Sequence, residues 1–120
     1  MNRGEIWVVR LDPTVGTEIS KTRPTVIVND DAVGILPLKI IVPITDWKER
    51  YATRPWMVKL EPSSENGLSK SSAVDTFQIR SVSETRLIRL LGKLTNTEIA
   101  AISEALATVL SLTLATPEAQ

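Results

Sequence analysis

A polar loop between two strand-like runs contains the side chains whose types and spacing best suit chemistry. The loop holds Glu18, Lys21 and Arg23, and Pro24 follows where the loop gives way to the second run. The proline fixes the backbone there, so Arg23 can aim its guanidinium fork at an anion. A lone arginine is more often a surface side chain, but two cations and a carboxylate in one loop favour a phosphate site.

The residue types that the chain lacks narrow this chemistry. Its 120 residues include no cysteine and no histidine. This removes thiolate nucleophiles, disulfides, the commonest metal ligand and the commonest proton shuttle at neutral pH. Any catalysis must use carboxylates, arginine, lysine or hydroxyl groups. We predict that the protein needs no metal ion and no other cofactor.

Four ordered segments resemble a known family. They are RGEIWVVRLDPTVGTEISKTRPTVIVN (3–29), IVPIT (41–45), ENGLSK (65–70) and FQIRSV (77–82). In this order, and followed by a C-terminal helix, they resemble the MazF/PemK family, the ribonuclease toxins of bacterial toxin–antitoxin pairs. The resemblance covers nearly the whole chain. It implies a mainly β fold with a C-terminal α-helix (α+β), an SH3-like small barrel of the MazF/PemK/CcdB type.

The resemblance suggests catalytic roles for two residues, and the chemistry suggests a third. Arg23 matches the family arginine that engages the scissile phosphate. Thr45 matches the threonine, or serine in some relatives, that partners it; by itself, Thr45 is better explained as a strand-end residue that satisfies a backbone group. Attack by a neighbouring 2′-hydroxyl needs a proton acceptor. Without histidine, the carboxylate of Glu18 is the natural candidate, although it can also be a solvated loop residue.

Further residues are predicted to contact RNA: Lys21, Asn29, Asp30, Trp47, Gln78 and Arg80. Asn29 and Asp30 can read base edges, although a simple turn explains them nearly as well. Trp47 follows the catalytic threonine and can stack on an unpaired base. Gln78 and Arg80 are assigned either to RNA contact or to support of a dimer.

Short apolar runs between polar turns predict strands in the first three quarters of the chain. We place them at residues 5–11, 25–29, 40–44, 57–60, 73–80 and 90–94. Pro43 cannot donate to a ladder, so its strand should end there or lie at an edge. In the fifth run, alternation puts Gln78 and Arg80 on one face and Phe77 on the other. Phe77 and Trp7 are expected in the core.

The last quarter of the chain has helical spacing. Thr95, with Glu98 three residues later, forms a capping box, and apolar residues follow at helical intervals. Only Glu98 and Glu104 are charged between residues 97 and 115. A helix this apolar is expected to bury more than one side. Part of it should pack on the barrel and part on a second copy of the chain in a homodimer.

Length and charge fit one domain with a localised site. We expect a single domain over residues 1–115 and a short tail at 116–120. Net charge is zero, but residues 1–94 hold 14 basic and 11 acidic residues. This small surplus permits nucleic-acid binding without requiring it. The start lacks the apolar core of a signal peptide and no run is long enough to cross a bilayer, so we expect a cytoplasmic protein with no membrane contact.

The resemblance implies a metal-independent, sequence-selective endoribonuclease that cleaves single-stranded RNA, chiefly messenger RNA, and the composition is compatible with it. It would act as the toxin of a type II toxin–antitoxin system and inhibit translation and growth. The resemblance implies a cognate antitoxin as partner, with DNA association only through that antitoxin. Two alternatives stay open: a noncatalytic toxin of the same fold that inhibits DNA gyrase, and a small RNA-binding barrel without turnover.

Overall fold

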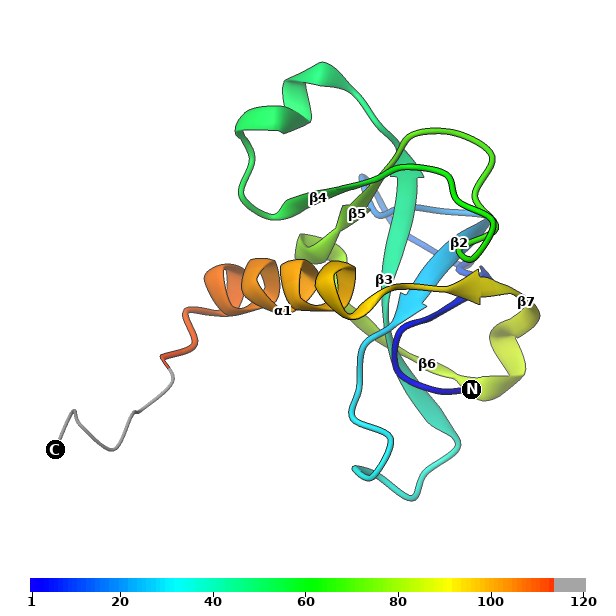
Figure 1. Ribbon diagram of the computed structural model, residues 1–120. Helices are drawn as coiled ribbons and strands as arrows, with labels where there is room; N and C mark the ends of the chain where they lie inside the picture. The colour runs from blue at the N-terminus through cyan, green and yellow to red at the C-terminus, as the bar shows by residue number, and fades with distance from the viewer. Residues whose placement is uncertain (114–120) are drawn as a thin grey trace, which may run out of the picture.

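The structure, a computed structural model, describes residues 1–113 (Figure 1), and the predicted tail at 116–120 lies outside them. Its strands are β1 (Glu5–Arg10), β2 (Thr22–Ile27), β3 (Leu38–Asp46), β4 (Met57–Leu60), β5 (Ser72–Asp75), β6 (Arg80–Ser83) and β7 (Leu87–Lys93). Three short 3-10 helices, η1 (Glu49–Thr53), η2 (Thr76–Gln78) and η3 (Glu84–Arg86), and the α-helix α1 (Asn96–Leu110) complete this part of the chain.

The strands form an antiparallel sheet with β3 at its centre. The strand order is β4-β5-β3-β2-β1-β7, and β6 also pairs with β3. The first half of β3 pairs with β6 and its second half with β5, while β2 pairs with it along the other side. The helix α1 follows the last strand and packs on β4 and η2 (Figure 1). The predicted fold, mainly β with one C-terminal helix, is confirmed.

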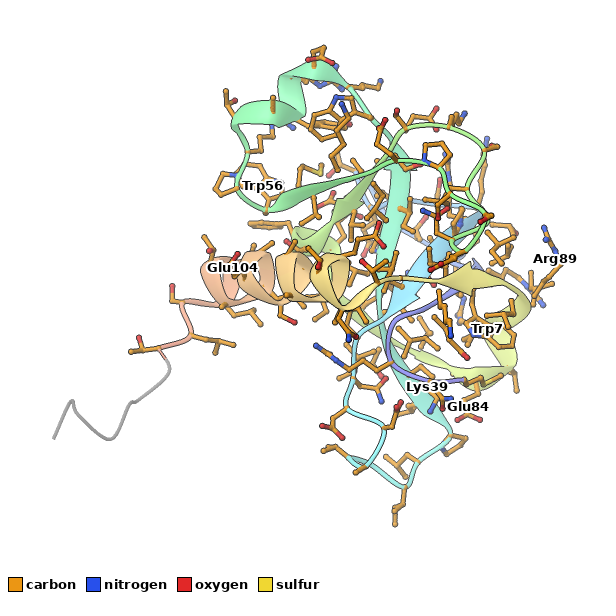
Figure 2. All side chains as sticks on the ribbon, viewed as in Figure 1. Trp7, Lys39, Trp56, Glu84, Arg89 and Glu104 are labelled. Atoms are coloured by element: carbon orange, nitrogen blue, oxygen red, sulfur yellow. The ribbon has the colours of Figure 1, made fainter. Side chains whose placement is uncertain are left out.

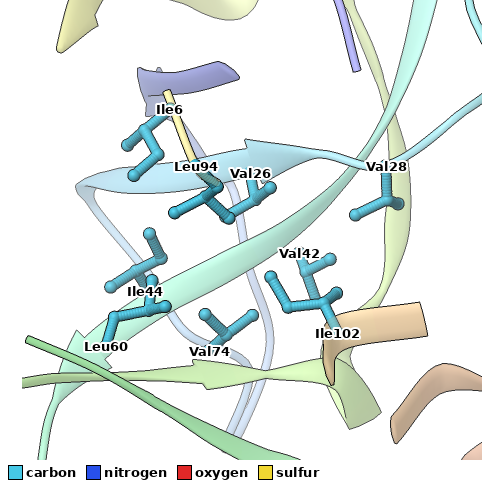
Figure 3. Close-up of a cluster of buried hydrophobic side chains, with 9 residues drawn as sticks. All are labelled: Ile6, Val26, Val28, Val42, Ile44, Leu60, Val74, Leu94 and Ile102. Carbon is cyan, nitrogen blue, oxygen red and sulfur yellow. The ribbon is translucent and has the colours of Figure 1, made fainter. Parts of the chain in front are cut away.

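Alternation along the strands builds two apolar cores. The larger consists of Ile6, Val26, Val28, Val42, Ile44, Leu60, Val74, Leu94 and Ile102 (Figure 3). The second consists of Val9, Leu11, Ile27, Ile41, Val82 and Leu87, with Trp7 packed against it while partly exposed. Because successive strand residues point to opposite faces, Ile41 and Val42 enter different cores. Both faces of the central strands are covered, which holds the ends of β2 and β3 in place.

The expectation that the third strand ends at Pro43 or lies at an edge is wrong. Pro43 is buried inside β3, which continues to Asp46. The ladder with β6 ends at Ile41, and the ladder with β5 begins at Ile44. The proline therefore lies in the gap where one partner strand replaces the other, and a residue without an N–H is tolerated there.

The single strand predicted at residues 73–80 is also wrong, because a turn interrupts it. The β5 strand ends at Asp75, whose carboxylate accepts a hydrogen bond from the N–H of Phe77 at 3.1 Å and so caps η2. An aspartate that binds a backbone N–H two residues on is a common turn device. Phe77 leaves the core and is 68% exposed, contrary to prediction. Gln78 and Arg80 therefore do not alternate along one strand, because Gln78 lies in η2 and Arg80 begins β6.

The predicted capping box of the C-terminal helix is present. The N–H of Glu98 donates to Thr95 Oγ1 at 3.1 Å, and the N–H of Thr95 donates to Glu98 Oε1 at 2.9 Å. Only Ile102 and Ala105 of the helix are buried, and Leu110 is exposed. Within the chain α1 therefore buries one narrow side. No helix in residues 1–113 is long and apolar enough to span a membrane.

Candidate functional site

Arg23 and Thr45 lie at adjoining ends of β2 and β3. The ladder between these strands ends at the pair of Thr25 with Pro43. Arg23 and Thr45 each lie two residues beyond that pair, on neighbouring strands, and they line the same cavity. The structure thus brings together the two residues that sequence analysis assigned to the scissile phosphate.

Both residues border a cavity of about 510 Å³, here named the first hollow. Its three cations come from separate segments: Arg23 on β2, Lys70 in the loop between β4 and β5, and Arg89 on β7. Thr45 on β3 is one of several hydroxyl residues in the lining, which also includes Asp46. Three cations suit a phosphodiester, since guanidinium and ammonium groups donate to its oxygens and oppose its charge.

The cations of the first hollow keep donors for a ligand. Arg23 donates from Nε to the carbonyl oxygen of Ser20 at 3.3 Å, the one hydrogen bond that its guanidinium makes within residues 1–113. Lys70 Nζ lies 3.0 Å from Asp46 Oδ1, and both side chains are exposed. Exposed ion pairs contribute little stability, so a phosphate can replace this partner at small cost. Arg89 extends from β7 into solvent (Figure 2).

Sequence reasoning did not identify Lys70 and Arg89 as site residues. Lys70 ends the matched segment ENGLSK, so a signal was present without an assigned role. Arg89 reaches the site only through the pairing of β7 with β1. Gly67 holds the ENGLSK turn close to β7: its φ is +70°, and a Cβ there would collide with the carbonyl oxygen of Leu91.

Glu18 does not line the first hollow. It borders a second cavity of about 300 Å³, here named the second hollow, together with Phe77, Gln78 and Arg80. Glu18 Oε1 accepts a hydrogen bond from the N–H of Val15 at 2.5 Å. The structure therefore places the predicted proton acceptor beside the predicted catalytic pair but not in the same cavity.

Gln78 and Arg80 fasten the loop of residues 11–21, which joins β1 to β2. Gln78 Oε1 accepts from the N–H of Ile19 at 2.6 Å, and Gln78 Nε2 donates to Asp75 Oδ2 at 3.1 Å. Arg80 donates to the carbonyl oxygen of Leu11 at 3.2 Å. These bonds tie the loop that carries Glu18 and Lys21 to the turn after β5. Holding this loop in place is therefore an alternative to the predicted RNA contact of the two side chains.

Asp75 is the buried anchor of this arrangement. Burial raises the pKa of its carboxyl, although hydrogen bonds from the N–H of Phe77 and from Gln78, together with the charge of Arg54, act in the opposite direction. The amide of Gln78 thus links a buried carboxyl to the backbone of a surface loop.

The remaining predicted RNA contacts fall at two different places. Lys21 is exposed with a φ of +68°, two residues before Arg23. Asn29 and Asp30 lie beyond the opposite end of β2, where Asn29 Oδ1 accepts from the N–H of Ile40 at 3.0 Å and Asp30 Oδ1 accepts from a neighbouring backbone N–H. The structure does not bring Asn29 and Asp30 to either hollow, and their hydrogen bonds fit the turn explanation.

Trp47 belongs to an aromatic and cationic cluster next to the end of β3. Its ring meets the ring of Tyr51 edge-on, with centroids 5.9 Å apart, and Lys59 Nζ lies 5.0 Å from its centroid. Arg50 and Arg54 lie 5.4 and 5.3 Å from the centroid of Tyr51. Trp47 stays partly exposed, and its role as a stacking surface for a base stays a prediction.

Metal ligands do not gather in the part of the chain that the structure describes. No group of three or more aspartate, glutamate, histidine or cysteine side chains is placed to hold an ion there. The first hollow has three cations and one carboxylate residue, Asp46, in its lining, a balance that suits an anion better than a metal ion.

The chain folds as a small antiparallel barrel, and Arg23, Lys70 and Arg89 gather with Thr45 around one hollow in it. Residues 2–110 match the family model described as the PemK-like, MazF-like toxin of type II toxin–antitoxin systems. The chain belongs to this family, as the sequence segments indicated.

Relatives of known name support this membership. The chain is 34% identical over 112 residues to endoribonuclease MazF9 of Mycobacterium tuberculosis, covering 88% of this chain and 92% of that protein. It is 31% identical over 107 residues to endoribonuclease MazF of Staphylococcus epidermidis, covering 88% of each.

Solved structures share the fold. A mycobacterial endoribonuclease in complex with its cognate antitoxin superposes with a TM-score of 0.75 at 23% identity, covering 96% of this chain and 99% of that one. A MazF of Deinococcus radiodurans gives a TM-score of 0.76 at 21% identity, covering 93% and 97%.

Proposed function

We propose that this protein is an endoribonuclease that cleaves single-stranded RNA as the toxin of a type II toxin–antitoxin system. The observation that carries the proposal is that Arg23 and Thr45 line one hollow together with Lys70 and Arg89. Relatives that align over most of the chain are named endoribonucleases. Family membership and the chemistry of the first hollow therefore agree.

The proposed reaction is an internal transfer at phosphorus. The 2′-hydroxyl attacks the adjacent phosphate, a bond from the 2′-oxygen to phosphorus forms, and the bond from phosphorus to the 5′-oxygen breaks. The 2′-hydroxyl gives up its proton and the departing 5′-oxygen takes one up, from Arg23 or from solvent, so the products are a 2′,3′-cyclic phosphate and a 5′-hydroxyl. Arg23 stabilises the charge that accumulates on the phosphoryl oxygens, and Thr45 donates a hydrogen bond to one of them.

Glu18 is proposed as the group that takes the proton of the 2′-hydroxyl. Arginine is a poor base because its pKa lies above about 12, and a carboxylate is the natural alternative. Its carboxylate lies at the second hollow, so the loop must bring it closer when RNA binds. Catalytic contacts are often long without substrate and tighten in the complex.

The proposal extends to the biological role of the protein and to its binding partners. We infer that messenger RNA is the main substrate, so that cleavage inhibits translation and growth in the cytoplasm. A cognate antitoxin binds the toxin and accounts for any association with DNA. A homodimer is proposed from the apolar side chains that the barrel and helix leave exposed.

The test is digestion of end-labelled single-stranded RNA by the purified protein in excess EDTA. We expect cleavage at defined sites, with 5′-hydroxyl and cyclic-phosphate ends. Products with 5′-phosphate ends, or cleavage that strictly requires an added divalent metal, would contradict the mechanism. Tight binding of RNA without any cleavage would favour the RNA-binding alternative.

A further inference from the structure

Phe77 is a rigidly presented surface aromatic. Its side chain is 68% exposed, while its neighbour Thr76 is completely buried. Thr76 donates from Oγ1 at 2.7 Å and from its N–H at 3.1 Å to the carbonyl oxygen of Trp56. Gln78, on the other side, is held by Ile19 and Asp75. The ring therefore projects from a fixed turn, so little ordering is needed before a ligand can pack on it.

The Phe77 ring has a defined position relative to its aromatic neighbour. The ring of Trp56 meets it edge-on, with centroids 6.1 Å apart and planes inclined at 63°. The guanidinium of Arg54 lies 5.8 Å from the centroid of Trp56, and Trp56 lies on the side of the barrel above α1 (Figure 2). Edge-to-face packing is a favoured geometry for aromatic pairs. It supports the ring without covering most of it.

Phe77 also lines the second hollow, whose chemistry is mixed. Leu11, Pro43 and Ile79 give it apolar walls, and Arg80 and Glu18 give it charged ones. Arg80 donates from Nη1 to the carbonyl oxygen of Leu11, and a guanidinium has five N–H donors in total. An aromatic face, apolar walls and a few polar groups match the way in which proteins hold unpaired bases.

The second hollow adjoins the proposed cleavage site. Pro43 lines it, and Thr45 lies two residues further along β3. Two strand residues span about 7 Å. One RNA strand can therefore place its cleaved phosphate in the first hollow and a neighbouring base in the second.

We propose that the second hollow binds one nucleobase of the RNA substrate, next to the cleaved bond, by stacking on Phe77. This inference rests on the proposed function. It assigns a specificity role to a residue that sequence analysis had placed in the core. The ring recognises the flat face of the base, and the polar groups of the hollow contact its edge.

The test pairs a change in the protein with a change in the RNA. An oligonucleotide with one mapped cleavage site is prepared intact and with a single abasic residue at each nearby position. For the wild type, we expect one position where base removal lowers kcat/KM by about 5- to 150-fold, the loss that corresponds to one stacked base. Phe77→Ala should lower cleavage of the intact RNA by a similar factor. It should not lower cleavage of that abasic RNA further.

Three control variants make the result specific. Phe77→Tyr should retain cleavage of the intact RNA, because the aromatic face remains. Phe77→Leu keeps apolar bulk without that face and should behave as Phe77→Ala does, which also guards against a loss of fold in the alanine variant. Ile88→Ala removes an exposed apolar side chain on β7, away from the second hollow, and should behave as the wild type.

Other outcomes overturn the proposal. One such outcome is that the loss from base removal and the loss from Phe77→Ala multiply at every abasic position. Another is that Phe77→Ala cleaves intact RNA at the wild-type rate. Phe77→Ala can also leave cleavage unchanged while weakening inhibition by the antitoxin, which would assign the ring to a protein partner. In each case the wild type still cleaves RNA. A wild type that cleaves no RNA refutes the proposed function itself.

Discussion

The two ends of β3 have surfaces of opposite character. At the C-terminal end, Thr45 joins Arg23, Lys70 and Arg89 around the first hollow. At the N-terminal end, β3 continues the hairpin from β2 and carries exposed apolar side chains. This apolar hairpin surface consists of Val33, Ile35, Leu36, Leu38 and Ile40. The hairpin lies at the far end of the barrel from the η1 loop (Figure 1).

The contrast separates two kinds of binding on one strand. Cations and hydroxyls suit a phosphate, which carries charge that must be neutralised. Grouped apolar side chains on a surface suit a protein, because their contact with another apolar surface removes area from water. We therefore expect RNA cleavage to depend on the first end, and self-association to depend on the second.

The largest effect should come from Arg23. Arg23→Ala removes the fork that shares the first hollow with Thr45, and loss of one transition-state donor typically lowers kcat by about 10² to 10³. Arg23→Lys should fail as well, because a point charge does not reproduce a bidentate fork. Arg10→Ala, an exposed arginine on β1 outside the first hollow, is the matched control. If folded Arg23→Ala protein cuts labelled RNA at the same rate as Arg10→Ala, RNA cleavage does not depend on Arg23 beside the C-terminal end of β3.

Thr45→Ala should lower cleavage by roughly 100-fold for the same reason. Thr45→Ser keeps the hydroxyl and should retain most of the activity, whereas Thr45→Val keeps the branched shape and should not. Single-turnover cleavage measures the chemical step directly. Equal rates for the serine and valine variants would show that the hydroxyl does no chemistry.

The sequence predicted structural features that depend on residues close together along the chain. The capping box of Thr95 and Glu98 is local, and it is present. The turn at Asp75 is also local, but the apolar alternation around it imitates a strand, so Phe77 was placed in the core. Arg23 and Thr45 were paired through the family resemblance alone. Their meeting in one hollow, like the approach of Arg89, follows from long-range strand pairing that one sequence does not display.

The apolar end is tested by Leu36→Glu. If the apolar hairpin surface joins two copies, the substitution places a carboxylate in the contact. It should weaken the dimer by roughly 30-fold, in line with about 2 kcal/mol for an uncompensated polar group. Leu110→Glu changes the exposed end of α1, the surface that sequence analysis favoured, and should have less effect. Sedimentation equilibrium at micromolar concentration ranks the two variants. A larger effect of Leu110→Glu than of Leu36→Glu would show that the dimer contact is formed by α1.

Gln78→Ala should lower RNA cleavage by less than the substitutions at Arg23 and Thr45. It removes the hydrogen bonds through which Gln78 joins Ile19 of the loop to Asp75, each contributing about 0.5 to 1.5 kcal/mol. We expect about a tenfold loss in kcat/KM. Gln78→Glu keeps the acceptor for the N–H of Ile19 but places a second carboxyl beside Asp75. Its activity should therefore fall as pH rises and both groups ionise. A pH profile parallel to that of the wild type would exclude this positioning role.

The smallest effect concerns stability, and it depends on pH through Asp75. Burial raises the pKa of this carboxyl in the folded protein, so the folded state holds the proton more tightly than the unfolded chain does. The resulting stabilisation is fully present below the unfolded pKa of about 4. It is lost as pH rises through the raised value. Asp75→Asn stays neutral and lacks this dependence, while every other carboxylate is common to both proteins. In urea unfolding, the stability of the wild type minus that of Asp75→Asn should therefore decrease between acid and neutral pH. A flat difference, or one that increases, would show that the hydrogen bonds from Phe77 and Gln78 outweigh burial.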